Sequence, residues 1–161
     1  MVQELMGRMR GDAATVGYFD GGDTRGMTAL SLACRNGRVD VAGVLLQGGA
    51  GVDERSGAYA MTPLMHAACK GQTATVEFLL TANGASVDAS AKDDNGMCAV
   101  LHAAAGGSVG CFQALAKAWP RGEVGAREER DSKGRNALML AARFGGKEMC
   151  RYLLDSGEAG L

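Results

Sequence analysis

The sequence predicts an all-α solenoid of stacked helix-turn-helix units with short β-hairpin-like fingers, and three observations support this prediction. One pattern of residue types occurs four times, at 26–37, 60–71, 96–107 and 134–145. The glycines that close the four copies are separated by 34, 36 and 38 residues. Each copy is followed by a second run of apolar residues at helical spacing, so each period contains two helices joined by a tight turn.

The copy at 60–71 shows why the pattern predicts a short helix. Thr62 can cap free backbone amides, and Pro63 suits the first helical position because it has no N–H to satisfy. Gly71 can end the helix because glycine adopts the left-handed conformation without steric cost. A helix of about two turns is marginal alone, so it must be stabilised by packing on its copies.

The order Thr-Pro-Leu-x-x-Ala-Ala, a closing glycine and a second helix ending in Leu-Leu resembles the ankyrin repeat. The resemblance implies one ankyrin-repeat domain over 1–161, with a degenerate N-terminal repeat that acts as a polar cap. The expected units are a capping repeat at 1–22, repeats at 23–56 and 57–92, a repeat with an insertion at 93–130 and a C-terminal repeat at 131–161.

The second full repeat departs from the family pattern at its finger. Fingers usually open with Asp and carry Gly three residues later, as at Asp23 and Gly26. The second repeat has Gly57 and Ala60 at these positions. Because positive φ is less favourable for alanine than for glycine, we expect a different turn in this finger.

The third repeat departs from the pattern in both of its helices. Cys98 replaces the capping threonine, and Ala99 replaces the proline that follows it. In the second helix, Ala116 stands where the other repeats have leucine. We therefore expect the third repeat to be the least stable part of the stack.

Composition limits the classes of protein to consider. The chain has 161 residues, 47% of them apolar, which suits one domain with a buried core. The net charge is −1, so nothing indicates a dedicated nucleic-acid or membrane-surface protein. No apolar run approaches the roughly 20 residues that span a bilayer, and the N-terminal apolar run is too short for a signal peptide. We expect a cytoplasmic or nuclear protein.

The five cysteines show no C-x-x-C spacing. Four of them occupy repeat positions that hold small apolar residues elsewhere, so we expect them in the core of a protein in a reducing compartment. These four are Cys34, Cys98, Cys111 and Cys150. Cys69 lies near the exposed end of its helix, so we expect it to be the most reactive thiol.

The two histidines, His66 and His102, could indicate a metal or catalytic site. They share one repeat position, and Leu32 and Leu140 occupy it in the other repeats. A position that accepts leucine is apolar, so we expect packed histidines with one satisfied nitrogen. Neighbouring repeats would place them roughly 10 Å apart, too far to share a zinc ion bonded at about 2 Å. No catalytic motif is present, so we expect no enzyme, no catalytic residues, no metal and no cofactor.

The segment 118–130 is the main irregularity of the chain. Trp119 and Pro120 should end the outer helix of the third repeat, and the charged residues 121–130 should form an extended link. A longer surface loop adds little closure entropy, so the insertion can be neutral. Trp119 can either pack its ring against the stack, which we expect, or anchor a partner.

The resemblance implies a protein-binding face built from the finger tips and the solvent ends of the inner helices, which we call the concave face. Fold alone does not identify a partner, so the residues on this face decide the prediction. The expected contact residues are Arg10, Arg25, Met27, Arg35, Asn36, Tyr59, Met61, Cys69, Lys70, Met97, Lys133, Arg135, Arg143 and Phe144.

Two features distinguish the concave face. Seven of its positions are basic and only Asp94 is acidic, although the whole chain carries a net charge of −1. Methionine recurs at one finger position, as Met27, Met61 and Met97, with Tyr59 beside it. Separately, the charges can be a solvated surface and the methionines a packing ladder between fingers. Together they favour a binding surface.

We therefore expect a non-catalytic, monomeric protein-interaction module, an adaptor or scaffold, that binds a partly acidic, partly apolar protein segment on the concave face. An alternative is an assembly chaperone or stoichiometric inhibitor that covers one folded client. A module that binds anions or nucleic acid is a weaker expectation, and membrane binding is not expected.

Overall fold

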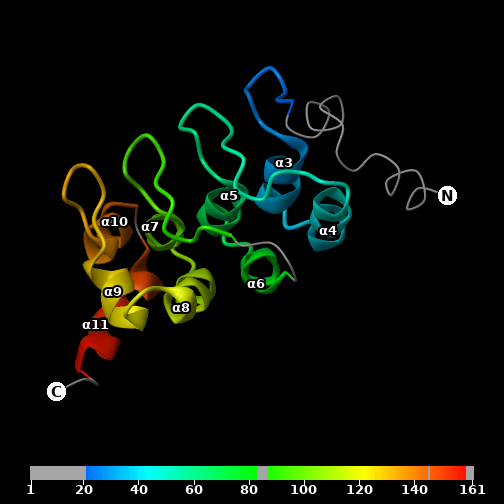
Figure 1. Ribbon diagram of the computed structural model, residues 1–161. Coiled ribbons are helices and arrows are strands. Elements are labelled where there is room, and N and C mark those ends of the chain that lie inside the picture. Colours follow the sequence, from blue (N-terminus) through cyan, green and yellow to red (C-terminus); the bar gives the residue numbers. More distant parts are fainter. Residues whose placement is uncertain (1–20, 83–86, 145, 159–161) are drawn as a thin grey trace.

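The computed structural model describes residues 21–82, 87–144 and 146–158, and the helices in this part of the chain form two rows (Figure 1). The inner row consists of α3 (Ala29–Arg35), α5 (Pro63–Cys69), α7 (Ala99–Ala105) and α10 (Ala137–Phe144). The outer row consists of α4 (Val39–Gln47), α6 (Thr73–Thr81), α8 (Val109–Ala118) and α11 (Lys147–Glu158). Each inner helix packs on the next inner helix, so the predicted stack of helix pairs is confirmed. The expected capping repeat lies outside the described residues apart from its last two positions.

Side-chain caps begin α3 and α5, as the sequence predicted. Thr28 Oγ1 accepts a hydrogen bond from Ser31 N at 3.2 Å, and Thr62 Oγ1 accepts one from Met65 N at 3.3 Å. Cys98 makes no side-chain capping hydrogen bond, so α7 begins without the hydroxyl that starts α3 and α5. Nevertheless, every residue from Ala99 to Ala104 is buried.

Each described finger contains a tight turn closed by a backbone hydrogen bond. Glycine closes three of these turns, and Ala60 closes the other, where its N–H donates to Gly57 O at 3.3 Å. Ala60 has φ 52°, in the same left-handed region as the glycines. Alanine therefore accepts the less favourable conformation, but the expected difference in this finger is present at its first position, where Gly57 has φ 74° and the aspartates of the other fingers do not have positive φ. The pairing below the turn does differ, since Ser56 pairs with Met61 in an antiparallel bridge.

Backbone hydrogen bonds also join each finger to the next. The three junctions are Gly57 N to Gly26 O at 2.9 Å, Asp94 N to Tyr59 O at 3.1 Å, and Ser132 N to Asn95 O at 3.1 Å. These bonds fix the spacing of the side chains at the finger tips, so groups from neighbouring repeats can act as one surface.

The core lies between the two rows and contains the cysteines that the sequence placed there. Cys34, Cys98 and Cys111 are 0% exposed, and Cys150 is half-buried on α11. Cys69 is exposed at the end of α5. All five are free thiols. The predicted difference between Cys69 and the other cysteines is confirmed.

The insertion forms a helix, so the expectation of an extended link is wrong. α9 (Gly122–Glu128) begins after Arg121, which turns the chain with φ 65°. Ala126 is fully buried, and Glu123 forms an ion pair with Arg127 at 2.8 Å one helical turn away. Burial of one face and a pair at this spacing stabilise a helix in a segment whose composition resembles a loop.

Trp119 packs within this insertion. It is 8% exposed, at the C-terminal end of α8. A Cβ at Gly125 would come within 3.2 Å of Trp119 Cδ1, so glycine lets α9 approach the indole closely. The expectation that the ring packs against the stack is confirmed, and the alternative that it anchors a partner is wrong.

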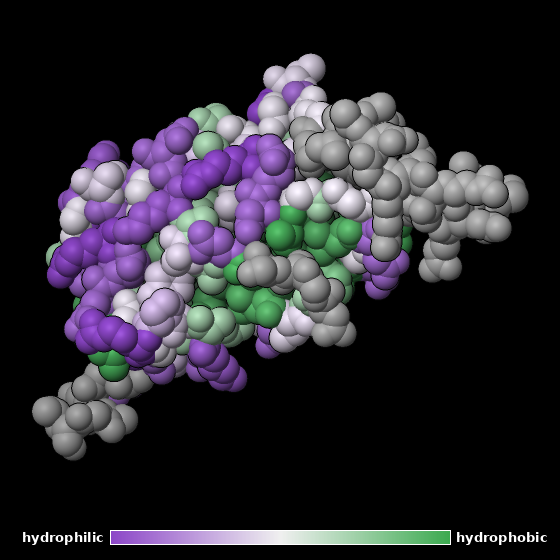
Figure 2. Space-filling view, in the orientation of Figure 1, coloured by the Kyte–Doolittle hydropathy of each residue, from purple (hydrophilic) through white to green (hydrophobic). Residues whose placement is uncertain are grey.

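Polar and apolar surface are unevenly distributed over the stack. In the view of Figure 2, hydrophilic residues dominate the C-terminal part of the stack, and apolar residues gather near α4 and α6. On α4, Val41 and Val44 are 49% and 45% exposed. Apolar surface is therefore not confined to the concave face, and a test of binding must include the outer helices.

Candidate functional site

A pocket of about 490 Å³ lies between the first two described fingers and the C-terminal ends of α3 and α5. Seven of the fourteen expected contact residues line it, so the structure brings half of that set together. We call it the basic pocket. Its lining residues are Arg25, Met27, Arg35, Ser56, Gly57, Ala58, Tyr59, Met61, His66, Cys69 and Lys70.

The three finger methionines are buried. Met27, Met61 and Met97 are 5%, 8% and 8% exposed, so they do not form an exposed row. The packing is close, since a Cβ at Gly57 would lie 3.1 Å from Met27 Sδ. The structure thus favours the packing ladder between fingers. Met27 and Met61 also line the basic pocket, where they contribute its apolar floor.

Tyr59 supplies exposed aromatic surface beside this floor. It lies at the tip of the second described finger and is 57% exposed. Its carbonyl oxygen accepts the hydrogen bond from Asp94 N, so the backbone is held while the ring remains accessible. An aromatic ring on a fixed backbone is a typical anchor for a protein partner.

Three cations surround the basic pocket, and no acidic side chain lines it. Arg25 is exposed and lies 3.6 Å from Asp23, a loose surface pair. Arg35 is half-buried and Lys70 is exposed, and neither has an ion pair among the described residues. The pocket therefore presents net positive charge above an apolar floor.

The other described members of the expected contact set lie outside the basic pocket. Arg135 Nε donates to Asp131 Oδ2 at 2.7 Å, so its charge is neutralised within its own finger. The guanidinium of Arg143 lies 5.7 Å from the ring centre of Phe144, and both side chains are exposed at the end of α10. Asn36 Nδ2 donates to a carbonyl of its own helix.

Three further residues complete the comparison with the sequence. Lys133 is exposed on the last finger, and Met97 is buried in the third. Arg10 lies outside the described residues. The expected face thus divides into the basic pocket and three exposed residues of the C-terminal repeat, Lys133, Arg143 and Phe144, which we call the exposed group.

His66 is a structural residue of the pocket wall. It is 7% exposed, and its Nε2 lies 3.2 Å from Ser56 Oγ, which in turn donates to Ser31 Oγ at 2.6 Å. Burial lowers the pKa of His66 to about 4, and the positive charge of Arg35 adds to this effect. The imidazole is therefore neutral near pH 7, and the predicted packed histidine is confirmed.

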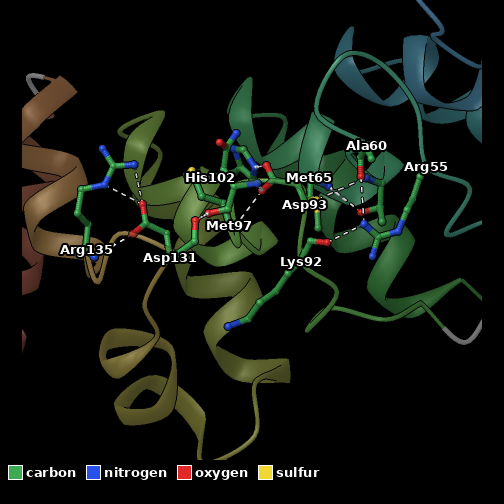
Figure 3. A network of polar contacts seen from close by, with 12 residues as sticks. Arg55, Ala60, Met65, Lys92, Asp93, Met97, His102, Asp131 and Arg135 are labelled. Atoms are coloured by element: carbon green, nitrogen blue, oxygen red, sulfur yellow. Dashed lines mark hydrogen bonds and ion pairs between the residues drawn. The ribbon is translucent and has the colours of Figure 1, made fainter.

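His102 occupies the same repeat position but has a charged partner. Its Nε2 lies 2.9 Å from Asp93 Oδ2 (Figure 3). Burial alone would lower the pKa of His102, but the hydrogen bond to Asp93, together with the electrostatic influence of Cys69, outweighs burial and raises it. Sequence reasoning predicted the burial of His102 but missed its pairing with the Asp93 carboxylate.

A sequence signal for the Asp93–His102 pair does exist. Only the third repeat has both an aspartate opening its finger and a histidine nine residues later. Cys69 belongs to the preceding repeat, so its influence on the pKa of His102 arises only when α5 and α7 stack. Within the described ranges, no group of three or more His, Cys, Asp and Glu side chains is arranged to hold a metal ion.

Stacked helix pairs, finger turns and a surface pocket without a recognisable catalytic motif define the class as a helical repeat protein. Residues 1–91 and 85–160 match the family model described as ankyrin repeats in three copies. The chain therefore belongs to the ankyrin-repeat family, whose repeats generally mediate protein–protein interaction.

Two similar proteins are both called ankyrin repeat domain-containing protein 63. The human protein is 37% identical over 107 residues, which cover 65% of this chain and 27% of that protein. The mouse protein is 37% identical over 102 residues, which cover 62% of this chain and 25% of that protein. The match therefore spans about a quarter of these relatives. No helix in the described parts of the chain has both the length and the apolar character needed to cross a membrane.

Proposed function

We propose that this chain is a non-catalytic adaptor or scaffold that binds a partly acidic, partly apolar protein segment on its concave face. The single observation that supports this most is the basic pocket, where Arg25, Arg35 and Lys70 surround an apolar floor with no acidic lining residue. An apolar side chain enters this pocket, and carboxylates beside it in the partner meet the three cations.

The size of the basic pocket suits this role. Its volume of about 490 Å³ lies in the range of roughly 300 to 1,000 Å³ that encloses drug-sized groups. One bulky apolar side chain and its neighbouring backbone fit such a space. Burial against Met27, Met61 and Tyr59 would slow dissociation, because well-packed anchors contribute most of the binding free energy at an interface.

The cations act on the encounter between the two proteins. Charges on an exposed rim mainly change the association rate and the dependence on salt. The screening length shortens from about 30 Å at 0.01 M salt to about 10 Å at 0.1 M. Charge reversal at Lys70 should therefore weaken binding more at low salt than at high salt.

A second candidate is a stoichiometric inhibitor or assembly chaperone for one folded client. The exposed group of Lys133, Arg143 and Phe144 favours it, because this group repeats the basic and apolar character of the pocket at the far end of the stack. A folded client large enough to cover the whole face would contact both groups. A short segment held in the basic pocket would not.

Binding of defined peptides tests the proposal. The probe is a fluorescent peptide with Phe or Leu between acidic residues, compared with the same peptide carrying lysines, and the measurement is anisotropy at two salt concentrations. Lys70→Glu and Arg35→Glu should weaken binding of the acidic peptide, whereas Tyr59→Ala should weaken it with little salt dependence. Lys117→Glu on α8 is the matched control, because it makes the same charge change at an exposed outer site.

Two outcomes would contradict the proposal. If Lys117→Glu weakens binding as much as Lys70→Glu, net charge and not the basic pocket governs binding. If pocket substitutions have no effect and substitutions at Val41 and Val44 abolish binding, the partner docks on the outer helices. Met61 is unsuitable for this test, because truncating a buried methionine would also destabilise the fold.

A further inference from the structure

We propose that the partner segment crosses the basic pocket in the polyproline II conformation, with an acidic residue at the first described repeat and an apolar residue three positions away at the second. This inference rests on the proposed function, because it specifies the segment that the basic pocket binds. Three features of the structure support it: the different groups that the two repeats contribute, the distance between the repeats, and the exposed tyrosine.

The two repeats contribute different groups to the basic pocket. The first repeat contributes Arg25 from its finger and Arg35 from the end of α3, so both guanidiniums of the pocket belong to this repeat. The second repeat contributes Tyr59 from its finger and Lys70 from the cap of α5. Two guanidiniums favour a carboxylate at the first repeat, because their hydrogen bonds to carboxylates are charge-assisted. The tyrosine favours an apolar side chain at the second repeat.

The second repeat offers apolar surface that a partner can cover. Tyr59 is 57% exposed, Met61 of the same finger is 8% exposed, and both line the pocket. A side chain that covers the ring and reaches the methionine removes apolar surface from water. Lys70 then meets a carboxylate beside that apolar residue, which agrees with the mixed character of the proposed segment.

The distance between the repeats limits the conformation of the segment. α3 and α5 pack directly on each other, and the axes of packed helices lie roughly 8 to 10 Å apart. The fingers are also held together, because Gly57 N donates to Gly26 O at 2.9 Å. Two side chains of the partner must therefore point to the same side of the segment at roughly this distance.

Polyproline II meets this requirement and a β-strand does not. In polyproline II, with about three residues per turn and a rise of about 3.1 Å, residues i and i+3 lie on one face about 9 Å apart. In a β-strand, residues on one face are about 7 Å apart at i and i+2 and about 13 Å apart at i and i+4. Residues i and i+3 of a strand point to opposite faces.

An α-helix meets the distance but not the size of the pocket. Its residues i and i+7 lie about 10 Å apart on one face, but such a helix is roughly 10 to 12 Å wide and encloses on the order of 800 Å³. The pocket has a volume of about 490 Å³. A helix would therefore remain above the buried methionines, whereas a single extended chain can reach them.

Tyr59 also suits a segment in this conformation. Segments in polyproline II bind aromatic side chains on protein surfaces, because the conformation is already formed before binding and little entropy is lost. The carbonyl oxygen of Tyr59 accepts a hydrogen bond from Asp94 N at 3.1 Å, so the backbone that carries the ring is fixed. The binding surface is therefore prepared on the protein as well as on the segment.

A series of peptides of one composition tests the inference. Each peptide contains one Glu and one Leu in a background of Ala and Ser, separated by two, three, four or seven positions and made in both orders. Fluorescence anisotropy with the full chain measures the affinity. In one of the orders, the separation of three should bind about tenfold more tightly than the other separations, because only this peptide places both side chains on their sites.

The two residues between Glu and Leu test the conformation. At the separation of three, Pro-Pro between them should bind about tenfold more tightly than Gly-Gly, because proline restricts the free peptide to the bound conformation and glycine does not. The two peptides carry the same charge and the same side chains at the binding positions. A difference between them therefore reports on the backbone.

Substitutions assign the two peptide residues to the two repeats. Arg35→Gln should weaken binding of the Glu peptide about fivefold and leave unchanged the same peptide with Gln in place of Glu. Tyr59→Ala should weaken binding of the Leu peptide and leave unchanged the same peptide with Ala in place of Leu. Lys117→Gln is the matched control for Arg35→Gln, because it removes one positive charge at an exposed site on α8.

The outcomes distinguish this inference from the proposed function. If no peptide of the series binds, both fail. If the peptides bind with equal affinity at every separation, the proposed function stands and this inference is wrong. Tightest binding at a separation of two or four would indicate a β-strand, and at seven an α-helix, and each result would overturn the inference. Equal affinity of the Pro-Pro and Gly-Gly peptides would also overturn it.

Discussion

His66 and His102 occupy the same position in adjacent repeats, yet their pKa values shift in opposite directions. Ser56, a neutral hydroxyl, lies 3.2 Å from His66, whereas the carboxylate of Asp93 lies 2.9 Å from His102. Burial dominates for His66, whereas the hydrogen bond to Asp93, with the electrostatic influence of Cys69, outweighs burial for His102. The same repeat position therefore favours neutral imidazole in one repeat and imidazolium in the next. This gives two predictions in which stability depends on pH with opposite sign.

The first prediction concerns His66 and acid. The unfolded histidine titrates near 6.5 and the folded one at about 4, so the unfolded state gains a proton first and stability falls between these values. His66→Leu, which installs the residue found at 32 and 140, should remove on the order of 1 to 2 kcal/mol of the loss between pH 7.5 and 5. Urea unfolding at the two pH values measures this. An undiminished loss in the variant would contradict the prediction.

The second prediction concerns the Asp93–His102 pair. The folded pKa of His102 is raised, so its stabilising effect is complete below about pH 6.5 and disappears as the pH rises through the folded value. Asp93→Asn should therefore destabilise the protein more at pH 6 than at pH 9, as measured by thermal or urea unfolding.

A matched control exists at the first finger. Asp23 accepts the same two backbone hydrogen bonds, from Arg25 N at 2.8 Å and Met27 N at 2.9 Å, but Leu32 stands where the third repeat has His102. Asp23→Asn should have the same effect at pH 6 and pH 9. Equal pH dependence in the two variants would show that the imidazole is not involved.

The third prediction concerns backbone strain at Ala60. With φ 52°, this residue adopts a conformation that is unfavourable for a side chain with Cβ. Ala60→Gly should increase the free energy of unfolding by a few tenths to about 1 kcal/mol, since relief of strain exceeds the added entropy of the unfolded chain. Gly134→Ala is the reverse test, because nothing lies within 4 Å of the added Cβ. It should destabilise by about 1 kcal/mol, and a neutral result for both would argue against strain.

The fourth prediction concerns the start of α7. Sulfur is a weak acceptor, and Cys98 makes no side-chain cap, so Cys98→Thr should stabilise the protein by about 0.5 to 1 kcal/mol. Thr62→Cys should destabilise α5 by a similar amount. Amide hydrogen exchange should show the change within α7, and faster exchange there than in the other complete repeats remains the expectation from sequence. Slow exchange in α7 of the unsubstituted chain would show that its extensive burial outweighs the missing cap.

Local signals in the sequence predicted most of the fold, because a repeat helix is defined by residues close together in the chain. Thr62, Pro63 and Gly71 identify the ends of α5 without knowledge of its neighbours. α9 was missed because a charged, glycine-containing segment resembles a loop until Ala126 is seen to be buried.

The candidate site was harder to predict, because its properties depend on contacts between repeats. The finger position of Met61 was evident, but its 8% exposure depends on how closely the adjacent finger packs. The influence of Cys69 on the pKa of His102 likewise needs α5 and α7 to be stacked. The repeat pattern identifies equivalent positions in the four repeats, but it does not give the distances between side chains of neighbouring repeats.

The helix α9 changes how the C-terminal end of the stack should unfold. In an array whose units touch only adjacent units, the last unit can fray alone. Here α9 contacts α8 and α10, and Tyr152 and Leu153 of α11 bond to Glu123 at 2.6 Å and to Arg127 at 2.9 Å. Losing α11 therefore also removes two hydrogen bonds that hold the insertion. The two C-terminal repeats should therefore unfold together as one cooperative unit. Separate fraying of the last repeat is then no longer the most favourable first step of unfolding at that end.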